Sequence, residues 1–305
     1  MMHEKELTAV KDKFLPLEEL KNNQNEIISV LEKSKDEVIS FEHAYLRNCI
    51  DKTKKCAEYF KWSYYPLSNK TERSNTFFCK NHHLCLICAQ RRNVIKSNEW
   101  SNKINALLKV NKLLQVSHLI LTIKNKKNID EAYEVLIKYK GKITKIARSK
   151  KYEFNKILGY VGSIEFTKSE NGWHGHIHMI LLHTENLNSL KLHREWGKIS
   201  DAAHYIELID TKSSENQLTY IKNLCKYVSK PSQFSAQKNN IHELNLKIEF
   251  FIMCRKKHAR LLFSGGLLRG LDKEPNYEKI DLATPRYEGI AIFKNKKYQY
   301  RQLAA

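Results

Sequence analysis

The clearest alternation of polar and apolar positions runs through residues 172–182, where three histidines are separated by single residues and followed by Met-Ile-Leu-Leu. This period of two predicts a β-strand with His174, His176 and His178 on one face. Residues 160–168 have a similar strand pattern, and the residues between them, Ser169-Glu170-Asn171-Gly172, are typical of a turn. The two segments are therefore predicted to form a β-hairpin.

The register of this hairpin decides which side chains meet. If Lys168 lies opposite Trp173, then Glu165 lies opposite His176 and shares the face of the histidines. A single histidine on a strand is usually a tolerated surface residue, but imidazoles in register with a carboxylate form a typical ligand set for a metal ion. We therefore expect a metal site of Glu165, His176 and His178, with His174 as a further candidate.

Other hydrophobic patterns predict the rest of the fold. Helical spacing predicts helices over residues 93–114, 130–148, 187–196, 215–230 and 239–256, and shorter apolar runs predict strands over residues 117–124, 204–209 and 260–268. Residues 27–46 have looser helical spacing. We divide the chain into an N-terminal helical segment (1–50), a cysteine-rich module (51–95), a main domain (96–275) and a basic C-terminal tail (276–305).

The helix predicted over residues 215–230 has two distinct sides. Its apolar side consists of Leu218, Ile221, Cys225 and Val228. Tyr220, Asn223 and Tyr227 cluster on the opposite side, and Lys230 lies close to them. Tyrosines that only complete a core would lie on the apolar side, so this arrangement favours a hydroxyl group that reaches a ligand.

The seven cysteines suit metal binding better than a disulfide framework, because their number is odd and the chain does not open with a secretory signal. Cys85 and Cys88 form a C-x2-C pair that can hold zinc together with Cys79 and one further ligand. Cys56, His82 and His83 are the candidates for that ligand, and reduced cysteines without a metal are the alternative. A fully ligated zinc would be structural.

The charge favours a polyanionic partner. Lys and Arg outnumber Asp and Glu by 53 to 33, which gives a net charge of +20, and nucleic acid is a better candidate than an anionic membrane. Residues 103–156 alone hold fourteen basic and four acidic residues, which indicates a surface that follows a nucleic-acid backbone. No apolar run approaches the roughly 18 residues of a membrane span, so we expect a cytoplasmic protein.

Five blocks of the chain resemble the HUH endonuclease superfamily and, more narrowly, the type 1 rolling-circle plasmid replication initiators. The blocks are residues 119–125, 164–167, 174–178, 226–230 and 259–268, in the family's order. An upstream cysteine block extends the resemblance to Cys56, which makes Cys56 the first choice as fourth zinc ligand.

The resemblance implies an α+β fold in which helices flank a central antiparallel sheet, preceded by helical and zinc-binding segments. Residues 96–275 would be the nickase domain, with Mg or Mn on Glu165, His176 and His178. Tyr227 would attack DNA to give a 5′-phosphotyrosine and a free 3′-hydroxyl, and Lys230 would help its proton leave. The implied partners are a plasmid double-strand origin, single-stranded at the nick, and the host helicase and polymerase.

One position departs from the family's pattern. Members carry a glutamate four residues before the nucleophilic tyrosine, where this chain has Asn223, and an amide cannot accept a proton. Tyr220 could then act as a second nucleophile. A single-strand transposase, or a relaxase with His174 as third imidazole, remains an alternative, as does a DNA-binding regulator with structural zinc. A zinc hydrolase is disfavoured because no H-E-x-x-H motif is present.

Overall fold

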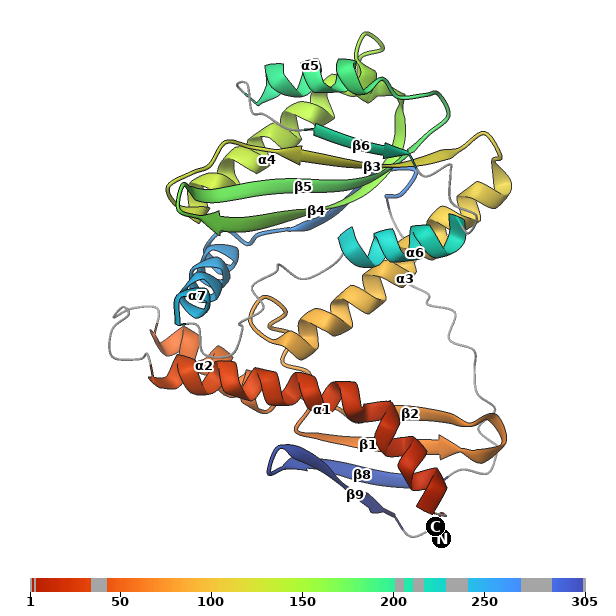
Figure 1. Cartoon of the computed structure of the whole chain (residues 1–305), viewed down its shortest axis with the longest axis vertical. Helices are drawn as coiled ribbons and strands as arrows, with labels where there is room; N and C mark the ends of the chain where they lie inside the picture. Colours follow the sequence, from red (N-terminus) through yellow and green to blue (C-terminus); the bar gives the residue numbers. More distant parts are fainter. Residues whose placement is uncertain are drawn as a thin grey trace. The chain divides into compact units, whose positions relative to one another are not determined.

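The chain folds into two compact units. The computed structural model describes residues 2, 4–33, 43–200, 206–210, 217–228, 241–269 and 287–303 (Figure 1). The first unit comprises residues 1–91, 235–247 and 276–305, and the second comprises residues 92–234 and 248–275. Within the described ranges, no helix has the length and apolar character needed to cross a membrane.

The first unit packs the helix α1 on one face of a four-stranded sheet. Its elements are α1 (Glu4–Lys33), α2 (His43–Lys54), β1 (Tyr59–Tyr65), the short η2 (Pro66–Ser68), β2 (Lys70–Ser74), β8 (Tyr287–Lys294) and β9 (Lys297–Gln302), with strand order β2-β1-β8-β9. Phe60 and Trp62 alternate inward along β1 and are fully buried, in one core with Val10 and Phe14 of α1. Alternate residues of β1 thus attach α1 to the sheet.

Part of the C-terminal segment that the sequence predicted to be a basic tail is folded into strands. Residues 287–302 form the strands β8 and β9, which extend the first sheet beside β1. The hairpin turns at Asn295 and Lys296, which both have positive φ angles of 52° and 64°. Lysine is an unusual residue for that backbone conformation, so the usual Asn-Gly signal for a tight hairpin was missing from the sequence.

The second unit is built on a five-stranded antiparallel sheet with the order β6-β3-β5-β4-β7. The strands are β3 (Gln115–Thr122), β4 (Ile157–Ser169), β5 (Gly172–His183), β6 (Ile206–Asp210) and β7 (Leu262–Gly266). β4 and β5 form the predicted hairpin, and its register places Lys168 opposite Trp173 and Glu165 opposite His176, as the sequence predicted. The α+β fold class expected from the sequence is confirmed.

Helices cover both faces of this sheet. The helical elements are α3 (Leu86–Val110), α4 (Ile129–Ile146), η3 (Glu153–Lys156), α5 (Ser189–Ile199), α6 (Gln217–Val228) and α7 (Ile241–Lys256), and α3 and α7 contribute residues to both units. α4 and α5 lie on one face (Figure 1). On the other face, residues of α3 and α6 share a core with Val116, Val161, Ile180 and Leu182. This second core covers one end of the strands, and the histidines lie toward the other end of the same face.

Candidate active site and metal centre

The hairpin places one carboxylate and two imidazoles on a single face, and of these the Glu165–His178 pair lies within reach of one ion. His178 Nε2 lies 3.5 Å from Glu165 Oε2, and both side chains are buried. The rings of His176 and His178 are 6.0 Å apart, and His176 Nε2 lies 3.5 Å from Thr167 Oγ1. Two ligand atoms of one ion, each about 2.1 Å from it, lie roughly 3 to 3.5 Å apart, so the Glu165–His178 pair fits a shared metal ion.

His174 lies at the more exposed end of the histidine row. Its Nδ1 is 2.6 Å from Asn125 Oδ1, a residue that follows β3, and its ring is 4.4 Å from that of His176. The amide therefore fixes the orientation of the imidazole at the edge of the site. This arrangement makes His174 a peripheral member of the set around Glu165.

Helix α6 places Tyr227 over the buried end of the row. The Tyr227 ring meets the His178 ring edge-on at 5.3 Å and remains 41% exposed. Ile221, Cys225 and Val228 are completely buried and hold the helix on the sheet, as predicted for the apolar side. The side chain of Leu218, the fourth residue of that side, falls outside the described residues. The phenol is thus fixed beside the imidazole while its outer side is accessible.

The other predicted residues of this helix have different surroundings. Tyr220 is half-buried and packs against the core formed with α3, and Asn223 is exposed. Of the two tyrosines, Tyr227 is the one whose ring contacts the histidines. Lys230 falls outside the described residues.

Two residues that the sequence did not single out also face this site. His118 of β3 is buried, and its ring lies 5.7 Å from His178 and 6.0 Å from Tyr227. Glu207 of β6 lies opposite Ile120, which in turn lies opposite His178. The alternation within residues 117–124 could place His118 on a face, but the neighbours of β3 were needed to decide which face.

Burial sets the charge state of the imidazoles. It lowers the pKa values of His118, His176 and His178 to about 4, so these rings are neutral at neutral pH. Neutral imidazoles are the form that binds metal ions. Within the described residues, His118 Nε2 and His178 Nδ1 are buried without a hydrogen-bond partner, so a ligand could bind these two nitrogen atoms.

Burial and two carboxylates affect the phenol of Tyr227. Burial is the main cause that raises the pKa of Tyr227, and the carboxylates of Glu165 and Glu207 raise it further. Both carboxylates disfavour a phenolate, so a cation bound at Glu165 would favour loss of the phenolic proton.

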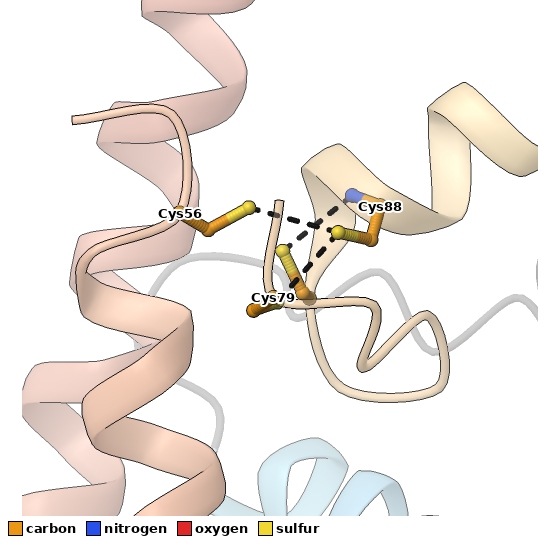
Figure 2. A group of neighbouring side chains, drawn as sticks. Cys56, Cys79 and Cys88 are labelled. Atoms are coloured by element: carbon orange, nitrogen blue, oxygen red, sulfur yellow. Dashed lines mark hydrogen bonds between the residues drawn. The ribbon is translucent and has the colours of Figure 1, made fainter. Parts of the chain in front are cut away.

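The first unit contains a four-cysteine cluster. The Sγ atoms of Cys56, Cys79, Cys85 and Cys88 all lie within 4.8 Å of one another, and all four residues are buried. Figure 2 shows the side chains of Cys56, Cys79 and Cys88 converging, with Cys88 Sγ 3.6 Å from each of the other two sulfurs. Tetrahedral zinc with Zn–S bonds of about 2.3 Å requires sulfurs roughly 3.8 Å apart, so this cluster could hold such a metal.

Cys56 thus takes the fourth position, as preferred from the sequence. It comes from the segment after α2, Cys79 and Cys85 precede the helix α3, and Cys88 lies in the first turn of that helix. His82 and His83 are not members of the cluster, and their rings pack against each other at 4.1 Å. Shared hydrogen bonds with Cys56 lower the pKa of Cys79 and raise that of Cys85, and metal binding would deprotonate all four thiols.

Two buried lysines accompany this cluster in the first unit. Lys21 Nζ donates a hydrogen bond to the carbonyl oxygen of Cys56 at 2.8 Å. Burial lowers the pKa of Lys247 to about 8, while Cys85 acts in the opposite direction. Four thiolates around a divalent ion leave a net charge of −2, which two ammonium groups would balance.

Comparisons with known proteins give one family match. No curated protein and no solved structure matches the chain. A family model described as "Replication protein" matches residues 70–297, which include the hairpin, Tyr227 and three of the four clustered cysteines. The chain belongs to this replication protein family, which confirms the resemblance to plasmid replication initiators drawn from its motifs.

Proposed function

We propose that the protein initiates rolling-circle replication of a plasmid by nicking one DNA strand at the double-strand origin, with Tyr227 as nucleophile. The observation that carries this proposal is the contact of the Tyr227 ring with His178, which itself lies beside Glu165. A replication protein needs a free 3′-hydroxyl to prime synthesis, and a partly exposed tyrosine next to a candidate metal-ligand set suits its production. The family also suggests an endonuclease in general terms.

Each residue has a defined part in this proposal. Glu165, His176 and His178 would hold Mg or Mn, which would supply Lewis-acid polarisation of the scissile phosphate. The Tyr227 oxygen attacks the phosphorus, the bond to the 3′-oxygen breaks, and the 5′-phosphate remains on the tyrosine. The energy of the phosphodiester is retained in the new bond, so the same site can rejoin or transfer the strand.

The remaining expectations fit the same proposal. A zinc ion on the four cysteines would be structural, because four sulfurs leave no open position for a substrate. The partners would be origin DNA and the host helicase and polymerase in the cytoplasm. The contact between His174 and Asn125 favours a two-histidine site over the three-histidine set expected of a relaxase.

A covalent adduct tests the proposal directly. Single-stranded oligonucleotides tiled along the replicon that carries the coding sequence are labelled at the 3′ end and incubated with the protein and Mg or Mn. We expect one of them to transfer its label to the protein in a denaturing gel, and chelation of the metal to prevent this. If none of the tiled oligonucleotides produced labelled protein, the nicking proposal would be refuted.

Tyr227→Phe should lower the rate of adduct formation by at least about 10³-fold, because it removes the nucleophilic oxygen and keeps the ring against His178. Oligonucleotide affinity should stay within about twofold. Tyr220→Phe is the matched control on the same helix and should retain the adduct, since its ring packs on the core. Persistence of the adduct in Tyr227→Phe would move the nucleophile elsewhere.

A further inference from the structure

Glu207 is a carboxylate on the catalytic face that the metal-ligand set does not use. It lies in a row of directly opposite residues across the sheet, Glu207, Ile120, His178 and Ser163. Residues directly opposite in antiparallel strands project to the same face. Glu207 therefore shares its face with His178 and Glu165, and it is half-buried.

Tyr227 lies over the strands between the two carboxylates. Its ring contacts His178 on β5 and His118 on β3. Glu165 is on β4, beyond β5, and Glu207 is on β6, beyond β3. Adjacent strands are about 4.8 Å apart, so Glu207 is only one strand away from His118. The sheet register thus places both carboxylates on the face that Tyr227 covers, each one strand beyond a ring that Tyr227 contacts.

We propose that Glu207 accepts the proton of the Tyr227 phenol when the tyrosine attacks DNA, and returns it when the tyrosine leaves. This inference rests on the nicking function proposed above. The O–H bond of Tyr227 breaks as its oxygen forms a bond to phosphorus, and the proton moves to the Glu207 carboxylate. The bond from phosphorus to the 3′-oxygen breaks, and that oxygen takes a proton from water to become the 3′-hydroxyl. Rejoining reverses each of these transfers.

The charges favour this role over a stabilising one. A charged carboxylate repels a phenolate. Glu207 would therefore disfavour the attack of Tyr227 unless it accepts the proton itself. Glu165 belongs to the ligand set beside His178, and the amide of Asn223 cannot accept a proton. His118 also contacts the tyrosine, through an edge-on contact between the two rings that fixes the position of the phenol.

The test combines Glu207→Gln with a change in the nucleophile itself. The probe is the oligonucleotide that the tiling experiment identifies, and the single-turnover rate of adduct formation is measured. Glu207→Gln should lower this rate by about 10²- to 10³-fold, as expected for loss of a general base, with probe affinity and Mn affinity unchanged. Incorporation of 3,5-difluorotyrosine at position 227 lowers the proton affinity of the phenol. Difluorotyrosine should raise the rate of adduct formation at least tenfold in Glu207→Gln and much less in the protein that retains Glu207.

The control is Glu185→Gln, an exposed carboxylate outside this face, which should nick normally. Glu207→Asp should be intermediate, because it keeps the base and shortens its reach. Normal nicking by Glu207→Gln would overturn the inference and leave the nicking function intact. Loss of Mn affinity, or a loss of rate that difluorotyrosine does not restore, would also overturn it. If difluorotyrosine instead rescues His118→Gln and not Glu207→Gln, the imidazole is the base and the inference fails.

Discussion

At the residue scale, the candidate site combines buried groups whose chemistry suits a metal ion. Glu165 and His178 are nearly inaccessible and 3.5 Å apart, and the low pKa of His178 keeps its ring neutral. A cation bound here would offset the free-energy cost of removing the Glu165 carboxylate from water. The proposed metal site is therefore the feature in which single substitutions should have the clearest consequence.

We expect His178→Ala to lower Mn affinity by more than about 100-fold, because it removes a ligand atom and not merely a supporting contact. Glu165→Ala should weaken binding more gently and be partly rescued by excess Mn in the adduct assay. Isothermal titration with Mn measures both without relying on activity. His193→Ala, an exposed histidine on α5, is the control and should bind Mn normally. Unchanged Mn affinity in Glu165→Ala would exclude Glu165 as a ligand.

The residues of the hairpin could be predicted from the sequence because they are close in the chain. A turn and a period of two define the register, and Glu165 opposite His176 follows from it. His118 and Glu207 could not be placed in this way, since their strands join the site from elsewhere in the sequence. A pairing between distant strands depends on tertiary packing, which a single sequence pattern does not contain.

At the element scale, the turn between β4 and β5 holds the register of the site. Gly172 has a φ of +108°, and a Cβ atom there would lie 2.4 Å from Lys126 O. The backbone of the next residue, Trp173, exchanges two hydrogen bonds with Lys126, at 2.7 and 2.8 Å. A side chain at Gly172 would therefore strain the turn and push apart two segments that are bonded to each other.

Gly172→Ala should accordingly lower the free energy of unfolding of the protein by about 1 to 3 kcal/mol. Gly141→Ala is the matched control within the exposed part of α4, where an added Cβ meets no atom within 4 Å. This substitution should raise stability by about 0.5 to 1 kcal/mol, because alanine is the better helix former. Denaturant unfolding compares the two variants, and equal effects would contradict the strain argument.

The start of α3 depends on both α1 and the cysteine cluster. Gln24 Oε1 of α1 accepts a hydrogen bond from the backbone N–H of Leu86 at 2.6 Å, and Cys85 and Cys88 flank this position. The cluster also belongs to the hydrophobic core of the first unit. Binding of a metal here would therefore be part of folding this unit.

Elemental analysis should find one zinc per chain, and Cys88→Ser should lose it together with thermal stability and solubility. Cys49→Ser is the control, because Cys49 is equally buried and lies outside the four-sulfur cluster. It should keep the zinc. A zinc-free preparation of the native protein with unchanged thermal stability would contradict a structural metal.

At the scale of the whole molecule, the sequence predicted one unit better than the other. The second unit follows from strong local patterns, and each of its predicted helices and strands is present among the described residues. Their ends agree within three residues except for α3, which begins seven residues and ends four residues earlier than predicted. The sheet of the first unit joins β1 and β2 to β8 and β9, which are more than 200 residues away in the chain. Such a long-range pairing has no local signal, so its last two strands resembled a basic tail.

The net charge of +20 includes exposed lysines near the face that carries Tyr227. Lys124 is exposed at the end of β3, next to the Asn125 that contacts His174, and Lys226 is exposed beside Tyr227. Lys145 belongs to the same basic stretch of sequence as Lys124, but it lies on α4, which packs on the opposite face of the sheet. If DNA lies across the histidine face, these three lysines should differ in their effect on binding, although their charges are equal.

Lys124→Ala and Lys226→Ala should each weaken single-stranded DNA binding for any base sequence and reduce the slope of log affinity against log salt by about 0.7, because each removes one phosphate contact. Each lost contact corresponds to about a threefold smaller change in affinity between 50 and 200 mM salt. Lys145→Ala should leave the slope unchanged. Fluorescence anisotropy with a labelled oligonucleotide across this salt range measures all three. An equal loss in Lys145→Ala would mean that the binding surface follows the charge of the whole molecule and not the face that carries Tyr227.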